Sequence, residues 1–81
     1  AHMNRSAFFK LFKDQFGITP VDYINRERVK LAKHLLSDSN LSVTEISWQS
    51  GFNDPNYFVR LFKKTEGITP GAYRAVSRKS A

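Results

Sequence analysis

The chain has 81 residues, no cysteine, and 13 Lys and Arg against seven Asp and Glu, which gives a net charge of +6. This length allows one small domain, and the lack of cysteine excludes disulfides and thiolate chemistry and suits a cytoplasmic location. The positive charge favours a polyanionic partner, nucleic acid before anionic membrane, and no apolar run approaches the ~20 residues that span a bilayer.

Start and stop signals divide the chain into predicted helices. Each proline follows a Thr or Asp, which is typical of a helix start because proline at the first helical position costs no hydrogen bond. Ser42 and Glu45 fit a capping box. Gly17, Gly51 and Gly67 each follow a periodic segment, where a glycine in the left-handed conformation can end a helix. With no segment that alternates as a strand would, the predicted fold class is all-α. The predicted helices cover residues 4 or 5 to 16, 20–37, 43–50, 55–66 and 70–77.

The first two predicted helices are amphipathic. Residues 5–16 carry Phe8, Phe12 and Phe16 at helical spacing, which indicates a buried face rather than a base-stacking surface. Residues 20–37 place leucines on one side and cations elsewhere. This second helix of ~18 residues would be a rod ~27 Å long at ~1.5 Å per residue.

The third and fourth predicted helices have the pattern of a helix-turn-helix. Ser47 is small enough for a close helix crossing, Gly51 supplies the tight turn, and Phe52 fills the corner. Phe58 and Phe62 then turn toward the core. The same spacing also fits a plain αα-hairpin that serves only packing, so the turn alone does not decide for DNA.

The outward face of the fourth predicted helix favours DNA over plain packing. Asn56, Val59, Arg60 and Lys63 follow the i, i+3, i+4, i+7 spacing that lines one face of a helix. Asn, Arg and Lys side chains suit base edges and phosphates, and a valine can touch a thymine methyl.

An internal repeat points the same way. Residues 6–23 (SAFFKLFKDQFGITPVDY) return as residues 56–73 (NYFVRLFKKTEGITPGAY), with nine of eighteen aligned positions identical and Arg60 in the place of Lys10. Such a repeat indicates that one structural unit has been used twice. A basic amphipathic helix followed by a second helix, present in two copies, is suited to an extended acidic partner.

The string ISWQSGFNDPNYFVRLFKK at residues 46–64 is followed by GITP at residues 67–70 and by Tyr73-Arg74. This combination resembles the signature of the AraC/XylS family of bacterial transcription regulators, and the match covers about residues 4–76. The resemblance implies two helix-turn-helix subdomains joined by a long linker helix, each with a recognition helix in a major groove. It further implies sequence-specific binding of double-stranded DNA, as part of an activator or a repressor.

The expected organisation of the chain follows from this resemblance. Residues 1–3 are expected to be a cloning remnant. Family domains have two helices ahead of the first recognition helix, so the first helix-turn-helix is expected to be incomplete. The Phe8, Phe12 and Phe16 stripe would then be exposed or buried against another copy of the chain. The expected divisions are residues 4–19 for the first recognition helix, 20–38 for the linker helix, 39–77 for a complete second subdomain and 78–81 for a tail.

The resemblance also assigns DNA contacts, position by position, to recognition helices at residues 5–16 and 55–66. The residues expected to face bases are Ser6, Phe9 and Lys10 in the first helix and Pro55, Asn56, Val59 and Arg60 in the second. The residues expected to hold the DNA backbone are Lys13, Lys63 and Arg74. The linker rod, with a helix-turn at each end, would space the two recognition helices by roughly one DNA turn, ~34 Å.

Other functions are weighed against this one. The main alternative is a protein-interaction module that contacts RNA polymerase or a partner regulator, and steep salt dependence of binding would separate DNA from such a partner. Binding to a membrane is disfavoured, because the aromatic residues are placed for a core. Enzyme activity is not expected without a His–carboxylate pair or a glycine-rich phosphate loop. His34 stands alone among ligand-type residues, so no metal and no cofactor are expected.

Overall fold

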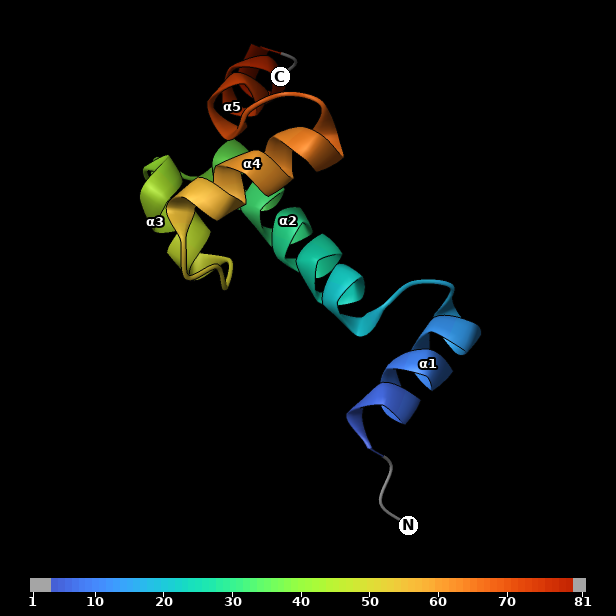
Figure 1. Ribbon diagram of the computed structural model, residues 1–81. Coiled ribbons are helices and arrows are strands. Elements are labelled where there is room, and N and C mark those ends of the chain that lie inside the picture. Colours follow the sequence, from blue (N-terminus) through green and yellow to red (C-terminus); the bar gives the residue numbers. More distant parts are fainter. Residues whose placement is uncertain (1–3, 80–81) are drawn as a thin grey trace.

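Figure 1 shows an all-helical chain in the computed structural model, which describes residues 4–79. The helices are α1 (Arg5–Phe16), α2 (Pro20–Asp38), α3 (Val43–Gln49), α4 (Pro55–Glu66) and α5 (Pro70–Lys79). No strand occurs in the described range, and the predicted all-α fold class is confirmed. The expected cloning remnant at residues 1–3 and the last two positions of the expected tail lie outside the described residues.

Side-chain caps explain where the helices begin. The side chains of Asn4, Thr19 and Ser42 each accept a hydrogen bond from the backbone N–H three residues later, at 2.7, 3.1 and 3.1 Å. Asp54 does the same for the N–H of Asn56 at 2.9 Å. Each bond satisfies a donor that the first helical turn leaves unpaired, and such a cap is worth about 1 kcal/mol. The helix starts predicted from capping residues are therefore confirmed.

The last helix is longer than predicted. α5 continues to Lys79, two residues past the predicted end at residue 77. Arg78, which was expected in a tail, donates hydrogen bonds to the backbone oxygen of Ser39 and to the side-chain oxygen of Asn40. Because these partners lie in the connection between α2 and α3, the extension depends on tertiary contacts rather than on local sequence signals.

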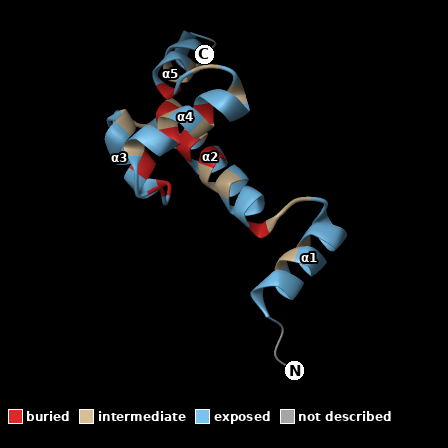
Figure 2. Ribbon diagram, viewed as in Figure 1, coloured by how far each residue is buried: buried red, intermediate tan, exposed pale blue. Residues whose placement is uncertain are grey.

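The core lies among α2, α3, α4 and α5 (Figure 2). Its buried apolar side chains are Val29, Ala32, Leu36, Ile46, Phe52, Phe58 and Phe62. α1 contributes no buried residue and contacts α2 through Phe12, whose ring packs edge-on at 5.8 Å from that of Tyr23. The body is elongated, 50 × 23 × 19 Å, with α1 at one end and the core at the other.

Candidate nucleic-acid interface

The turn between α3 and α4 brings these two helices into close contact. Gly51 has a φ of 101°, a conformation that glycine adopts without the steric cost of a Cβ. Ser47 is fully buried, and its hydroxyl donates to the backbone oxygen of Thr44 at 2.6 Å. Phe52 fills the corner with its ring 5.0 Å from that of Phe58. The predicted helix-turn-helix packing is thus confirmed in its small residue, its turn and its corner.

α4 separates a buried apolar face from an exposed polar one. Phe58 and Phe62 are fully buried in the core, whereas Asn56, Arg60 and Lys63 are exposed. The asparagine, arginine and lysine side chains make no hydrogen bond or salt bridge within the described residues. Their donor groups are available to a partner that lies along this face of α4.

The other predicted base-contacting residues differ in their exposure. On α4, Pro55 forms the first helical position and Val59 packs partly against the core, and both are half-buried. On α1, Ser6 and Lys10 are exposed, and Phe9 is half-buried beside the ring of its neighbour. Each residue therefore keeps some surface for contact, with the polar side chains the most accessible.

α1 and α4 run in the same direction in Figure 1, and each is followed by a glycine and an Ile-Thr connection to the next helix. The sequence repeat is therefore also a repeat of the backbone. Lys10 and Lys13 on α1 occupy the positions that Arg60 and Lys63 occupy on α4, and all four are exposed. Two like-built helices thus present cations from opposite parts of an elongated molecule.

Cations on α1 and on the outward face of α4 are not neutralised by the protein. The salt bridges within residues 4–79 are Lys30–Glu27 at 3.3 Å, Lys33–Glu66 at 2.8 Å and His34–Asp38 at 3.2 Å, and the last of these corrects the expectation that the chain has no His–carboxylate pair. The hydrogen bond to Glu66 raises the pKa of Lys33. The same contact joins α2 to the end of α4. The cations of these three pairs all lie on α2. Because the cations of α1 and α4 have no carboxylate partner within residues 4–79, their charge is available to phosphates.

No set of three or more His, Cys, Asp or Glu side chains in residues 4–79 is grouped as a metal site would require. Across the same range, no helix combines the length and the apolar character needed to cross a membrane.

Arg74, which is predicted to contact the DNA backbone, makes hydrogen bonds within the protein. Its Nε donates to the carbonyl oxygen of Leu36 at 3.1 Å, and its Nη2 donates to those of Ser39 and Leu41 at 3.2 and 2.6 Å. Carbonyls at the end of a helix have no helical partner, and the guanidinium supplies one. Arg74 fastens α5 to the α2–α3 connection, and its contact with the DNA backbone stays a prediction.

Two residues of α2 that the sequence did not single out hold the helix-turn-helix in place. The guanidinium of Arg28 lies 5.8 Å from the centroid of the Phe52 ring, and its side chain runs beside Gly51. Asn25 donates from Nδ2 to the hydroxyl of Tyr57 at 3.4 Å. These partners are more than twenty positions apart, so no local pattern could have indicated them.

Known proteins with similar sequences include helix-turn-helix transcription regulators. The sequence model of a family described as a helix-turn-helix domain matches residues 1–75. The uncharacterized HTH-type transcriptional regulator YisR of Bacillus subtilis is 42% identical over 79 residues, covering 96% of this chain and 28% of that protein. The HTH-type transcriptional activator RhaR of Salmonella typhi is 42% identical over 69 residues, covering 85% of this chain and 24% of that protein. The chain therefore spans less than a third of the length of these relatives.

This chain covers a larger share of several solved structures that have a similar fold. The C-terminal domain of the two-component response regulator yesN from Fusobacterium nucleatum has a TM-score of 0.85 at 42% identity, over 89% of this chain and 70% of that one. The DNA-binding domain of AdpA, solved in complex with a target DNA, has a TM-score of 0.90 at 33% identity, over 98% and 71%. A probable AraC family transcriptional regulator from Rhodopseudomonas palustris has a TM-score of 0.83 at 27% identity, over 94% and 72%.

Proposed function

The chain belongs to the AraC-type family of helix-turn-helix transcription regulators, and on that premise we propose that it binds DNA sequence-specifically through α4 and α1. Asn56 and Arg60 on α4 would read base edges, and Lys10 would be the corresponding cation on α1. Lys13 and Lys63 would hold the DNA backbone beside them. A transcription regulator of this kind acts on cytoplasmic DNA.

The observation that carries this proposal is the polarity of α4. Phe58 and Phe62 are fully buried on one side, while the exposed side carries Asn56, Arg60 and Lys63, whose side chains have no polar partner within residues 4–79. Arg in particular can donate two parallel hydrogen bonds to a guanine edge in the major groove. A plain packing hairpin would not require unpaired donors along the full outward face.

In this proposal the linker helix α2 sets the spacing of the two recognition helices. α2 is one uninterrupted helix of 19 residues, and at ~1.5 Å per residue such a helix is about 28 Å long. With the helix-turn at each end, the two recognition helices would lie roughly one DNA turn apart, ~34 Å. One face of a duplex offers successive major grooves at that interval.

A structural relative on DNA supports the same proposal. The DNA-binding domain of AdpA was solved with a target DNA and matches 98% of this chain at a TM-score of 0.90. The match includes both ends of α2, so it extends over the pair of helices and not over one of them alone. The target sequence of this chain is a separate property that depends on its own exposed side chains.

Selection of bound duplexes from a random library tests the proposal. The expected product contains two preferred elements whose centres are about 10 base pairs apart. Binding of a selected duplex should also weaken steeply as salt rises, because phosphate contacts release counterions. No enrichment, or enrichment with binding that is indifferent to salt, would favour a protein-interaction module such as one for RNA polymerase.

A further inference from the structure

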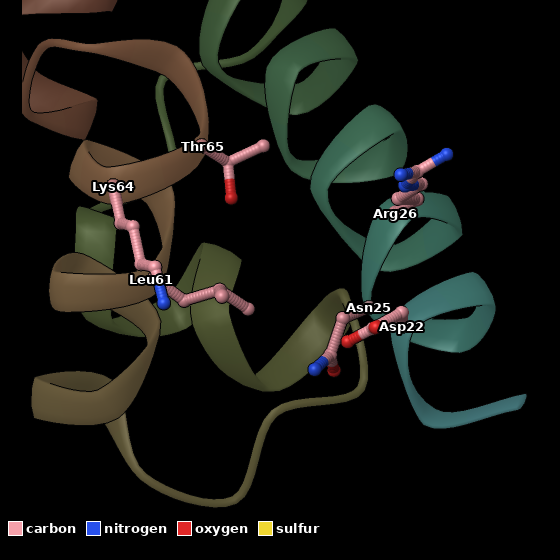
Figure 3. Close-up of a pocket in the computed structure, with 6 residues that line it drawn as sticks. All are labelled: Asp22, Asn25, Arg26, Leu61, Lys64 and Thr65. Atoms are coloured by element: carbon pink, nitrogen blue, oxygen red, sulfur yellow. The ribbon is translucent and has the colours of Figure 1, made fainter. Parts of the chain in front are cut away.

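A hollow of about 290 Å³ lies between the C-terminal half of α4 and the N-terminal half of α2 (Figure 3). Its lining residues are Asp22, Asn25, Arg26, Leu61, Lys64 and Thr65. A second hollow of about 310 Å³ shares Leu61 and Lys64 and extends the first to Tyr57 and Arg60. Together they form a trough that runs from the linker helix to the base-reading face of α4.

The trough carries an excess of positive charge. Arg26, Arg60 and Lys64 line it against a single carboxylate, Asp22, and none of these four groups is in a salt bridge within residues 4–79. Figure 3 shows Lys64 extended along α4, Asp22 directed from α2 toward α4, and Arg26 on the outer side of α2. A compact anion in the trough would therefore meet the Lys64 ammonium, with the Arg60 guanidinium in the adjoining hollow, whereas Arg26 is directed away from α4 and Asp22 is the one carboxylate nearby.

The walls of the trough are joined by a polar contact. Asn25 on α2 donates to the Tyr57 hydroxyl on α4 across the space between the helices, at 3.4 Å. This bond and the Lys33–Glu66 salt bridge at 2.8 Å hold the two helices at a set separation. Lys64 lines the hollow between these two helices.

The internal repeat sets Lys64 apart from the other cations of α4. Arg60 and Lys63 have the cations Lys10 and Lys13 at the matching positions of α1, but Lys64 is matched by Asp14. Lys64 faces the half of α2 that leads to α1, so it borders the space between the two recognition helices.

We infer that this trough binds a backbone phosphate of the strand that crosses from one major groove to the next, with Lys64 as its principal donor. The inference rests on the proposed function. A duplex that fills both grooves must carry its backbone through the space between α1 and α4, whereas a duplex under α4 alone ends before it. Phosphate contacts of this kind position the protein and report no base identity. Lys64 thus contributes to binding only when the duplex occupies both grooves.

The test compares Lys64→Gln on two duplexes. One is a selected duplex of roughly two helical turns, and the other is its α4 half alone, of roughly one turn. On the long duplex the plot of log affinity against log salt should become shallower by roughly 0.9, the share of one phosphate contact. On the short duplex, affinity and slope should equal those of the unmodified chain. Lys64→Arg should restore the slope on the long duplex.

A matched control removes the same charge elsewhere. Lys79 is exposed at the end of α5 and lines neither hollow, so Lys79→Gln should change neither slope. An equal change on both duplexes, or a change on the long duplex no larger than that of the control, would overturn the inference. Failure of the proposed function would look different, because the unmodified chain would then show no salt-dependent binding to either duplex, and the inference would fall with it.

Discussion

Arg60 is the side chain on which base recognition by α4 most depends. Its guanidinium is exposed and has no hydrogen-bond or salt-bridge partner among the described residues, while the neighbouring Phe58 and Phe62 anchor the helix in the core. Arg60→Ala should therefore weaken binding of a selected duplex by about 1–3 kcal/mol and relax the preference at one base pair. Titration against duplexes changed one base pair at a time measures both effects. An equal loss on selected and random duplexes would reassign Arg60 to a phosphate.

Lys63 should behave differently from Arg60 although it lies on the same face. A lysine ammonium is a point charge and suits phosphate more than a two-donor base contact. Lys63→Ala should weaken binding to all sequences alike and make the salt dependence shallower by roughly 0.9. Salt titrations on a selected and an unrelated duplex check this prediction. A loss confined to the selected duplex would show that Lys63 contacts a base.

Gly51 bears on stability rather than on recognition. Its φ of 101° strains any side chain, and a Cβ there would lie 2.9 Å from Nε of Arg28. Because Arg28 is flexible enough to move aside, the backbone conformation sets most of the cost. Gly51→Ala should lower the free energy of unfolding by about 1–3 kcal/mol. Gly71→Ala is the matched control: it is inside α5 with open space for a Cβ, and it should stabilise by about 0.4–1 kcal/mol in urea unfolding.

At the scale of helices, the boundaries that depend on neighbouring residues could be predicted from the sequence. The boundary that depends on residues far along the chain could not. The starts at Pro20, Val43 and Pro55 follow from the capping residues directly before them, and the left-handed Gly17 and Gly67 end α1 and α4. These signals lie within a few residues of the boundary they set. The extension of α5 depends on hydrogen bonds to the α2–α3 connection, which only the folded chain brings near.

The same distinction explains the outcome for the candidate site. The face with Asn56 and Arg60 is visible in the sequence because helical periodicity places it opposite Phe58 and Phe62. The role of Arg74 is not visible there, because its partners are three carbonyls that lie more than thirty positions away. An arginine on a predicted amphipathic helix looks the same whether it meets phosphate or backbone oxygen.

Arg74 therefore supports a prediction about how the last helix is held. Arg74→Met should leave the carbonyls of Leu36, Ser39 and Leu41 without their charged donor and lower the free energy of unfolding by about 1.5–3 kcal/mol. Arg78→Met removes an exposed guanidinium from the same connection and should cost less than about 1 kcal/mol. Urea unfolding followed by circular dichroism measures both. Equal costs for the two variants would contradict the role assigned to Arg74.

At the scale of the whole molecule, α1 lies outside the core that the other four helices share. It contributes no buried residue and packs on the start of α2. Helical periodicity indicated a buried face for Phe8, Phe12 and Phe16, yet Phe8 and Phe16 are 46% and 62% exposed. Periodicity predicts which side chains share a face, but whether that face is covered depends on what packs against it.

This exposed stripe leads us to propose that the chain self-associates through α1 when concentrated. Contiguous aromatic surface is costly to leave in water, and a second copy can cover it. Sedimentation equilibrium should show an average mass that rises above that of the monomer as concentration increases. Phe16→Glu should abolish the rise, because a carboxylate on the stripe cannot be buried against another aromatic surface without a partner.

A second exposed aromatic residue provides the control for this experiment. Trp48 on α3 is 58% exposed, nearly as much as Phe16, but lies outside the stripe. Trp48→Glu adds the same charge and removes a comparable apolar surface, so it should leave the association unchanged. An unmodified chain that remains monomeric at every concentration would contradict the proposal. So would equal effects of the two substitutions, since association would then follow total exposed aromatic surface rather than the face of α1.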